Sequence, residues 1–395
     1  MKYPDNILKK EEELLLQTYK RIPIEISHGE GVYLYSEDGK KYLDFFSGLA
    51  VIALGYGNGK VIQAIEEQIK KFIHISNYYI NSPQIELAER LVKYSGLSKV
   101  FLTNSGTEAA EASLKLVRKY FGPEKKIITF SNAFHGRTYG SLSLSGKDKY
   151  KKNFSPLLSN ILQLEFNDIE QLENHVDANT AAAYMEFVQG EGGIKVASYQ
   201  FAQKVVELRA KFGFALVADE VQSGIGRTGL PFAYNHYGIE PDLVIIAKAI
   251  GGGLPLGALI TNRKYENVFE YGDHGSTFGG NPVACAAGLA VIESVFNSGL
   301  INQVARLGKY FKSELELICE KHPNKFVDVR GLGFMIGVEF LKPCANLVKE
   351  FREQGILINC TSENVLRILP PLISTKENID HFINIFNQIV NEINE

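Results

Sequence analysis

The sequence predicts an α/β protein with a large domain built on a mainly parallel, doubly wound sheet and a smaller α+β C-terminal domain. Two observations predict the sheet of the large domain and the smaller C-terminal domain. From about residue 60 to Ile246, short apolar runs alternate with helical segments, which is the pattern of parallel strands joined by crossover helices. The last third breaks this alternation, because long amphipathic helices there flank a stretch rich in strand-forming residues.

The expected elements follow in order along the chain. Near the N-terminus, two short strands flank Asp38-Gly39, a strong turn dipeptide. The expected strands are Val32–Tyr35, Lys41–Phe45, Val100–Thr103, Ile127–Phe130, Ala181–Phe187, Ala215–Ala218, Leu243–Ile246 and those within Phe326–Phe340. The expected helices are Val61–Ile73, Glu108–Tyr120, Tyr199–Phe212, Gly288–Phe296, Leu300–His322 and a closing helix marked by Ile379, Phe382, Phe386, Ile389 and Ile393.

These elements suggest three segments. We expect residues 1–50 to pack on the small domain or on a partner subunit, residues 51–287 to form the large domain, and residues 288–395 to form the small domain. The chain has 395 residues, of which 45% are hydrophobic and 22% are charged, so it can bury a large core without disulfides or metals.

Charge and composition exclude several classes of function. Lys and Arg number 42 against 45 Asp and Glu, a net charge of −3, which argues against nucleic acid as the main partner. There is no apolar stretch of about 18 residues and no apolar signal core at the start, so we expect neither a membrane span nor export. The four cysteines are scattered without a CxxC pair, as is typical of buried thiols in a reducing, cytoplasmic compartment.

Polar side chains at the ends of the expected strands predict one ligand site. In open parallel sheets, ligands bind beyond the carboxyl ends of the strands. Five such ends are unusually polar, and they lead into Asn104–Glu108, Phe134–Thr138, Glu186–Gly193, Asp219–Gln222 and Lys248. Because these ends meet at one edge, we expect one large polar ligand held at several points, and therefore a cofactor.

Three of these features have a chemistry of their own. Ser105-Gly106-Thr107-Glu108 fits a phosphate cradle at a helix N-terminus, and its spacing also fits a capping box, which is compatible. Lys248 follows an apolar strand, where it is either a desolvated amine able to form a Schiff base or a lysine that snorkels to solvent. Asp219 ends another strand, where a carboxylate suits a pyridinium nitrogen, a helix cap or a metal, although no paired histidines support a metal.

Taken together, these segments resemble the class III aminotransferases, which are pyridoxal 5'-phosphate enzymes of fold type I. The resemblance covers nearly the whole chain. The segments that carry it are Asn104–Ala109, Phe134–Thr138, Val188–Gly193, Asp219–Gly224, Ala247-Lys248, Gly275–Pro282, Arg330–Gly333 and Leu366–Leu372.

The resemblance implies a role for each matching residue. Lys248 is implied to hold pyridoxal phosphate covalently and to act as general base for the proton shift, and Asp219 is implied to keep the pyridine nitrogen protonated. The other implied cofactor contacts are Ser105, Gly106 and Thr107 at the phosphate, Phe134 and Val221 on the two ring faces, Gln222 at the phenolic oxygen, and Thr277 at the phosphate of the neighbouring subunit. The Thr277 contact implies a homodimer with shared active sites.

Two arginines are implied to bind the substrates. Arg367 resembles the arginine that binds the α-carboxylate of glutamate and 2-oxoglutarate, a task that suits a bidentate guanidinium. Glu186 is the candidate to neutralise Arg367 while the amino donor is bound, with a purely structural ion pair as the alternative. Arg137 is implied to hold the distal carboxylate of the donor, with Ser276 nearby.

The resemblance leaves several ω-amino donors open. The motifs favour N2-acetylornithine, which belongs to arginine biosynthesis, while ornithine, succinylornithine, N-succinyl-diaminopimelate and 4-aminobutyrate remain alternatives. Leu49 stands where ornithine aminotransferases tend to carry Tyr. Asn58-Gly59, Phe187 and Ile52 also depart from the usual family residues, which affects the donor more than the cofactor. A regulator without catalysis is a different class, but the segment before residue 60 has no helix-turn-helix and no basic patch.

Overall fold

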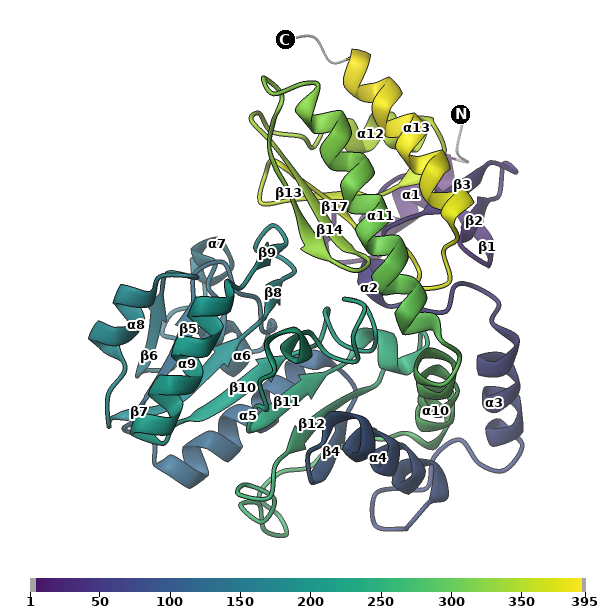
Figure 1. The fold of residues 1–395 in the computed structure, drawn as a ribbon. Coiled ribbons are helices and arrows are strands. Elements are labelled where there is room, and N and C mark those ends of the chain that lie inside the picture. Colours follow the sequence, from purple (N-terminus) through teal and green to yellow (C-terminus); the bar gives the residue numbers. More distant parts are fainter. Residues whose placement is uncertain (1–4, 393–395) are drawn as a thin grey trace.

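The computed structural model describes residues 5–392. It consists of a large unit around a seven-stranded sheet and a small unit that carries both ends of the described chain (Figure 1). Ile393, the last position expected in the closing helix, lies outside the described residues.

The large sheet has the strand order β4-β12-β11-β10-β7-β5-β6. Its strands are β4 (Lys99–Thr103), β5 (Lys126–Phe130), β6 (Ile161–Leu164), β7 (Thr180–Met185), β10 (Ala215–Asp219), β11 (Leu243–Ile246) and β12 (Gly257–Thr261). From β6 to β11 every neighbouring pair is parallel, whereas β12 runs antiparallel to both β11 and β4. The sheet is therefore mainly parallel, and β4 points the same way as the parallel strands.

Helices cover both faces of this sheet, which explains why its central strands are buried along their whole length. Tyr184 and Val217 lie in the cluster that packs on α5 (Gly106–Phe121), while Met185 and Leu216 face the opposite core. The other helices of the large unit are α3 (Gly59–Ile69), α4 (Ser82–Ser95), α6 (Tyr139–Leu144), α7 (Asp148–Lys151), α8 (Ile169–His175), α9 (Tyr199–Phe212) and α10 (Pro282–Phe296).

The starts of the helices follow from capping residues. Ser105 caps α5 by accepting a hydrogen bond from the amide of Glu108 at 3.3 Å, and the Glu108 carboxylate accepts one from the amide of Asn104 at 2.9 Å. Ser198 caps α9 in the same way, and α9 ends at Gly213, whose φ of 78° is a left-handed conformation that favours glycine.

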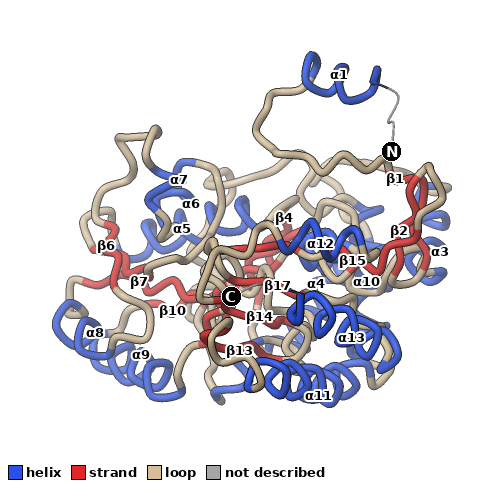
Figure 2. Tube along the Cα trace, turned by 90° about the horizontal axis from the view of Figure 1, so that it is seen from above, coloured by secondary structure: helices blue, strands red, loops and turns tan. Residues whose placement is uncertain are grey.

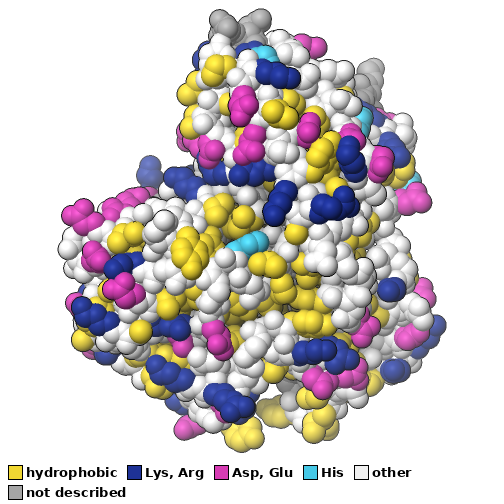
Figure 3. All heavy atoms as spheres, viewed as in Figure 1, with side chains coloured by type: hydrophobic (Ala, Val, Ile, Leu, Met, Phe, Trp, Pro, Cys, Tyr) yellow, Lys and Arg dark blue, Asp and Glu magenta, His cyan; other side chains and the backbone are white. Residues whose placement is uncertain are grey.

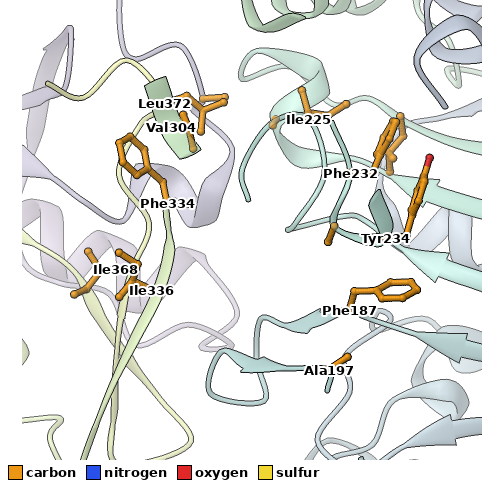
Figure 4. Close-up of a cluster of buried hydrophobic side chains, with 14 of the residues drawn as sticks. Phe187, Ala197, Ile225, Phe232, Tyr234, Val304, Phe334, Ile336, Ile368 and Leu372 are labelled. Atoms are coloured by element: carbon orange, nitrogen blue, oxygen red, sulfur yellow. The ribbon is translucent and has the colours of Figure 1, made fainter. Parts of the chain in front are cut away.

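The small unit is an antiparallel sheet covered by helices (Figure 1). Its sheet has the order β13-β14-β17-β16, from β13 (Phe326–Leu332), β14 (Met335–Phe340), β16 (Asn359–Thr361) and β17 (Val365–Ile368). Its helices are α11 (Leu300–Glu320), α12 (Leu347–Glu353) and α13 (Lys376–Glu392). Figure 4 shows buried side chains on either side of the junction with the large unit, including Phe334, Ile336 and Ile368 opposite Phe187, Phe232 and Tyr234.

The N-terminal segment joins the small unit. It contains α1 (Asp5–Leu14), β1 (Ile26–Glu30), β2 (Tyr33–Ser36), β3 (Lys41–Asp44) and α2 (Ser47–Ala50). β3 pairs in parallel with β15 (Ile356–Leu357), and the ring of Phe45 stacks on Phe382 of α13 with 5.4 Å between centroids. Helix α1 stands apart from the rest of the molecule when it is seen from above (Figure 2).

Helix α10 belongs with the large unit, since it packs on α3 and α4. The expected domain boundary at residue 287 falls inside this helix, and we propose to move it to the bend of 63° that separates α10 from α11. Within residues 5–392 no single helix is long and apolar enough to cross a membrane, although α10 and α11 meet that test as a bent pair.

The structure differs from the sequence-based expectations in several other places, of which the following are examples. The strand expected over Ala181–Phe187 ends at Met185, because the chain turns there into the short hairpin of β8 (Val188–Gln189) and β9 (Lys195–Val196). Strands β6 and β12 were not expected. The cysteines are less scattered than their spacing suggests, since the free Sγ atoms of Cys344 and Cys360 lie 3.0 Å apart.

Candidate active site

A cavity of 450 Å³ opens at the carboxyl ends of the parallel strands. The residues that line it include Ser105, Gly106, Thr107, Phe134, His135, Arg137, Glu186, Glu191, Asp219, Val221, Gln222 and Lys248. The five polar strand ends therefore meet at one site. In the view of Figure 3, Lys and Arg side chains gather along the junction between the two units.

Lys248 lies in the segment that connects β11 to its antiparallel neighbour β12, two residues after β11 ends. Its backbone has φ of +52°, a left-handed conformation that is unfavourable for a residue with a side chain. Burial lowers the pKa of the Lys248 ammonium to about 8, since desolvation penalises the charged form. A lysine whose neutral form is accessible near physiological pH is suited to nucleophilic attack and to proton transfer.

Asp219 ends β10 with a fixed carboxylate. Its Oδ2 lies 2.7 Å from Nδ1 of His135, and its Oδ1 accepts a hydrogen bond from the amide of Val221 at 3.0 Å. Burial acts to lower the pKa of His135, but the contact with Asp219 outweighs burial and raises it. Nε2 of His135 is buried and has no hydrogen-bond partner among residues 5–392, so the imidazole is oriented by Asp219.

His135 is a site residue to which the sequence reasoning gave no role. It lies within the Phe-His-Gly segment that carries the resemblance, but the segment by itself does not show that the imidazole turns inward. The signal that could have found it is a histidine directly after a strand end, opposite an aspartate at the end of another strand. Such a pair can share one hydrogen bond when both strand ends meet.

The start of α5 has the shape of an anion cradle. A side chain on Gly106 would lie 2.8 Å from a methyl group of Val221, so only glycine fits there. Gly136 has φ of 140°, and a side chain there would overlap the hydroxyl of Thr107. The Thr107 hydroxyl lies 2.6 Å from that of Ser141. Free amides at a helix N-terminus with neighbouring hydroxyls bind phosphate well.

The middle of the cavity fits a flat polar ring. Phe134 and Val221 line it, and Oε1 of Gln222 is buried there with no hydrogen-bond partner in the described part of the chain. A buried amide oxygen without a partner is costly, and turning the amide by half a turn would put its N–H groups in place of that oxygen. Together with Lys248 and Asp219, these residues therefore fit the ring of pyridoxal phosphate.

Arg367 lies on β17, next to the cavity but not on its lining. Its Nη1 lies 2.5 Å from Oε1 of Glu191 and its Nε donates to Oδ1 of Asn359 at 3.1 Å. Burial acts to raise the pKa of Glu191, but the charge of Arg367 outweighs it and lowers the pKa. The ion-pair partner of Arg367 in this structure is thus Glu191 rather than the expected Glu186.

Glu186 is held elsewhere by the turn that follows β7. Its carboxylate accepts hydrogen bonds from the amides of Phe134 at 2.9 Å and Gly190 at 3.1 Å. Burial and the nearby charge of Asp219 raise the pKa of Glu186 to about 7. These main-chain bonds already hold the Glu186 carboxylate, which is the physical reason why Glu191 rather than Glu186 pairs with Arg367.

Arg137 lines the cavity with its guanidinium stacked on an aromatic ring. Its Cζ lies 3.9 Å from the ring centroid of Tyr150 and 5.5 Å from that of Phe134, an arrangement in which cation–π attraction stabilises the charge.

Besides Arg367, three residues that the sequence implicated do not line the cavity. Ser276 instead accepts a hydrogen bond from Asn104 at 3.0 Å. Thr277 is exposed, and Leu49 lies on the short helix α2 rather than on the lining. A single protomer therefore does not bring Thr277 to its own cofactor cavity.

Comparison with known proteins gives one family. Residues 16–390 match the family described as aminotransferase class-III. The chain is 46% identical to an acetylornithine aminotransferase from Methanocaldococcus jannaschii, over 98% of this chain and 99% of that protein. It is 44% identical to an acetylornithine aminotransferase from Archaeoglobus fulgidus, over 96% of this chain and 98% of that protein.

Solved structures agree on the fold. The ornithine aminotransferase from Toxoplasma gondii superposes with a TM-score of 0.94 at 29% identity, covering 100% of this chain and 97% of that one. The acetylornithine aminotransferase from Elizabethkingia anophelis gives a TM-score of 0.86 at 31% identity, covering 98% of each chain. Because the backbone resembles both proteins, it does not discriminate between their donors.

Proposed function

This chain belongs to the class III aminotransferases, and on that premise we propose that it transfers the δ-amino group of N2-acetyl-L-ornithine to 2-oxoglutarate. The products are N-acetyl-L-glutamate 5-semialdehyde and L-glutamate, and the step belongs to arginine biosynthesis. The observation that carries the choice of donor is the near full-length identity of 44–46% with relatives named acetylornithine aminotransferase. We propose that the enzyme acts in the cytoplasm, where its free thiols remain reduced.

The family uses pyridoxal 5'-phosphate, which supplies an electron sink for the carbon that loses or gains the amine. We propose that Ser105, Gly106 and Thr107 hold its phosphate and that Asp219 pairs with the ring nitrogen. Phe134 and Val221 would pack on the two ring faces, and Gln222 would donate to the phenolic oxygen.

Lys248 would carry out two tasks at the reacting carbon. Its neutral amine would hold the cofactor covalently, and the same amine would act as the base that moves the proton during amino transfer. The lowered pKa, about 8, makes the neutral form accessible. His135 contributes by fixing the carboxylate of Asp219 through the 2.7 Å contact.

The two substrates would use different arginines. Arg137 would bind the carboxylate end of acetylornithine, far from the reacting δ-amine, with Ser276 nearby. Arg367 would bind the α-carboxylate of glutamate or 2-oxoglutarate, which lies next to the reacting carbon. Acetylornithine has no carboxylate at that place, so Glu191 neutralises Arg367 while the donor reacts. Glu186 lines the same cavity, where it would shape the substrate side without pairing with Arg367.

A homodimer would complete the site. Large apolar side chains are exposed beside Thr277, and they are Ile73, Tyr78, Tyr79, Ile80, Tyr271 and Phe278. Exposed apolar side chains gathered in one region often mark an interface with another protein chain. We propose that a second copy covers this region and that Thr277 of each copy reaches the phosphate of the other.

A donor panel tests the proposed function. Purified enzyme is assayed with 2-oxoglutarate and, in turn, acetylornithine, ornithine, succinylornithine, N-succinyl-diaminopimelate and 4-aminobutyrate. We expect acetylornithine to give the highest kcat/KM. A higher value for another donor would replace acetylornithine while leaving the reaction type intact.

A further inference from the structure

When a substrate carboxylate binds Arg367, the proposed function does not say which cation then pairs with Glu191. Arg367 is 2% exposed, and its Nη1 is already bonded to the Glu191 carboxylate. If the α-carboxylate of 2-oxoglutarate is to bind Arg367, as the proposed function requires, Glu191 has to leave. The released carboxylate then needs a new cation, because an unpaired charge in a largely buried place is costly.

The main chain of Glu191 cannot move far. Its carbonyl oxygen accepts three hydrogen bonds, from Nζ of Lys147, from the hydroxyl of Thr361 at 2.9 Å and from the hydroxyl of Ser362 at 3.2 Å. These donors come from both the large and the small unit. Glu191 can therefore exchange partners only by rotating its side chain about a fixed backbone.

Lys147 is the cation best placed for this exchange. Its ammonium donates to the Glu191 carbonyl and to Ser362 at 3.3 Å, which puts it beside the Glu191 side chain. Within the described part of the chain, no carboxylate oxygen lies within ion-pair distance of it. Burial lowers the pKa of Lys147, and the charge of Glu191 acts in the opposite direction. Lys147 is a half-buried ammonium without a carboxylate partner.

We propose that Lys147 is a positioning residue that accepts the Glu191 carboxylate when a dicarboxylate occupies Arg367. With a dicarboxylate bound, the cluster of Arg367 and Lys147 holds two anions, Glu191 and the substrate carboxylate, so each anion has a cation as its partner. With the donor bound, Glu191 stays on Arg367 and Lys147 keeps its carbonyl and hydroxyl partners. With glutamate or 2-oxoglutarate bound, the substrate takes Arg367 and Glu191 turns to Lys147.

Lys147→Met tests this proposal, because it keeps the length of the side chain and removes the charge. Glutarate, a dicarboxylate that cannot react, is titrated into the holoenzyme by calorimetry. We expect its Kd to rise about tenfold in Lys147→Met, the order of one charge-assisted contact, and to stay within about threefold in Lys147→Arg, which keeps the charge. The half-reaction with acetylornithine should change less than about twofold, since Glu191 does not move in it. Lys149→Met is the matched control, because Lys149 is exposed two residues away.

A double-mutant cycle separates positioning from simple structural support. In a Glu191→Gln background no carboxylate has to be relocated, so adding Lys147→Met should leave the Kd for glutarate nearly unchanged. An unchanged Kd in Lys147→Met alone, or the same tenfold loss in the Glu191→Gln background, overturns the role of Lys147 and leaves the proposed function standing. A wild-type holoenzyme that neither binds glutarate nor accepts an amine on 2-oxoglutarate overturns the proposed function and this inference together.

Discussion

Nδ1 of His135 and Oδ2 of Asp219 lie 2.7 Å apart. Both side chains line the cavity, and both are almost completely buried. The second oxygen of Asp219 is held by the amide of Val221. The carboxylate is thus fixed from two sides before any ligand arrives, as a group that must pair with a ring nitrogen should be.

Asp219→Asn should lower kcat at least ~100-fold, on the scale of losing an essential acid–base partner. The neutral amide cannot keep the ring nitrogen protonated, although it has nearly the shape of the carboxylate. His135→Asn should have a smaller effect in the same direction. Steady-state kinetics measures kcat of both variants, and the thermal melting temperature shows whether they remain folded. Near-native turnover in Asp219→Asn would make the carboxylate merely structural.

Lys248→Ala should abolish turnover and leave the protein folded. Without the amine, the cofactor has no covalent attachment and the proton shift has no base. Borohydride reduction of the wild-type holoenzyme, followed by peptide mapping, should place the pyridoxyl group on Lys248. If the label maps to another lysine, the assignment is wrong.

Covalent capture of pyridoxal phosphate by cofactor-free enzyme should depend on pH through Lys248. Burial lowers its pKa to about 8 from the ordinary 10.5, and only the neutral amine attacks. The capture rate should therefore rise with pH and level off above about 8. Glu191→Gln should move the midpoint to lower pH, because the negative charge of Glu191 raises the pKa of Lys248. A midpoint near 10 in the wild type would contradict the burial of this amine.

Arg367→Ala should impair the half-reactions with glutamate and with 2-oxoglutarate. Loss of a charge-assisted pair costs on the order of 1.5–3 kcal/mol, which is roughly tenfold to 100-fold in kcat/KM. Arg330→Ala is a suitable control, because Arg330 also forms an ion pair in the same small sheet, but with Glu339, whereas Arg367 is bonded to Glu191 of the cavity lining. An unchanged KM for 2-oxoglutarate in Arg367→Ala would show that Arg367 is not the carboxylate clamp.

Acetylornithine should exceed ornithine in kcat/KM by about 10- to 100-fold, because a free α-ammonium would be buried without a partner. Arg137→Ala should erase most of this preference by weakening acetylornithine, with a smaller effect on the glutamate half-reaction. Competition assays with both donors measure the ratio. Equal use of the two donors by the wild type, or a preference that survives Arg137→Ala, would favour one of the alternative donors.

Much of the fold was predictable, because its elements follow local rules. Helix Tyr199–Phe212 and strand Leu243–Ile246 have the bounds that periodicity predicts. Strand β12 was missed because Gly257–Thr261 begins with small residues and pairs with β4, a segment much earlier in the chain. Pairing over such a distance leaves no local pattern.

The site was predictable in its residue types but not in its pairs. The polar ends of the expected strands predicted that Lys248, Asp219 and Gly106 belong to one site, since parallel strands bring their carboxyl ends together. The choice between Glu186 and Glu191 as partner of Arg367 depends on main-chain hydrogen bonds in a turn, and no spacing in the sequence encodes those bonds.

The place of β4 at the edge of the large sheet has a consequence for the order of folding. β4 leads directly into the anion cradle of Gly106 and Thr107, and its one neighbour in the sheet is β12. During synthesis, β4 has left the ribosome long before β12 exists. Until then β4, which leads into the anion cradle, has no partner strand in the sheet. Contacts between distant segments form slowly. Refolding protein should therefore regain its helices before it can capture the cofactor.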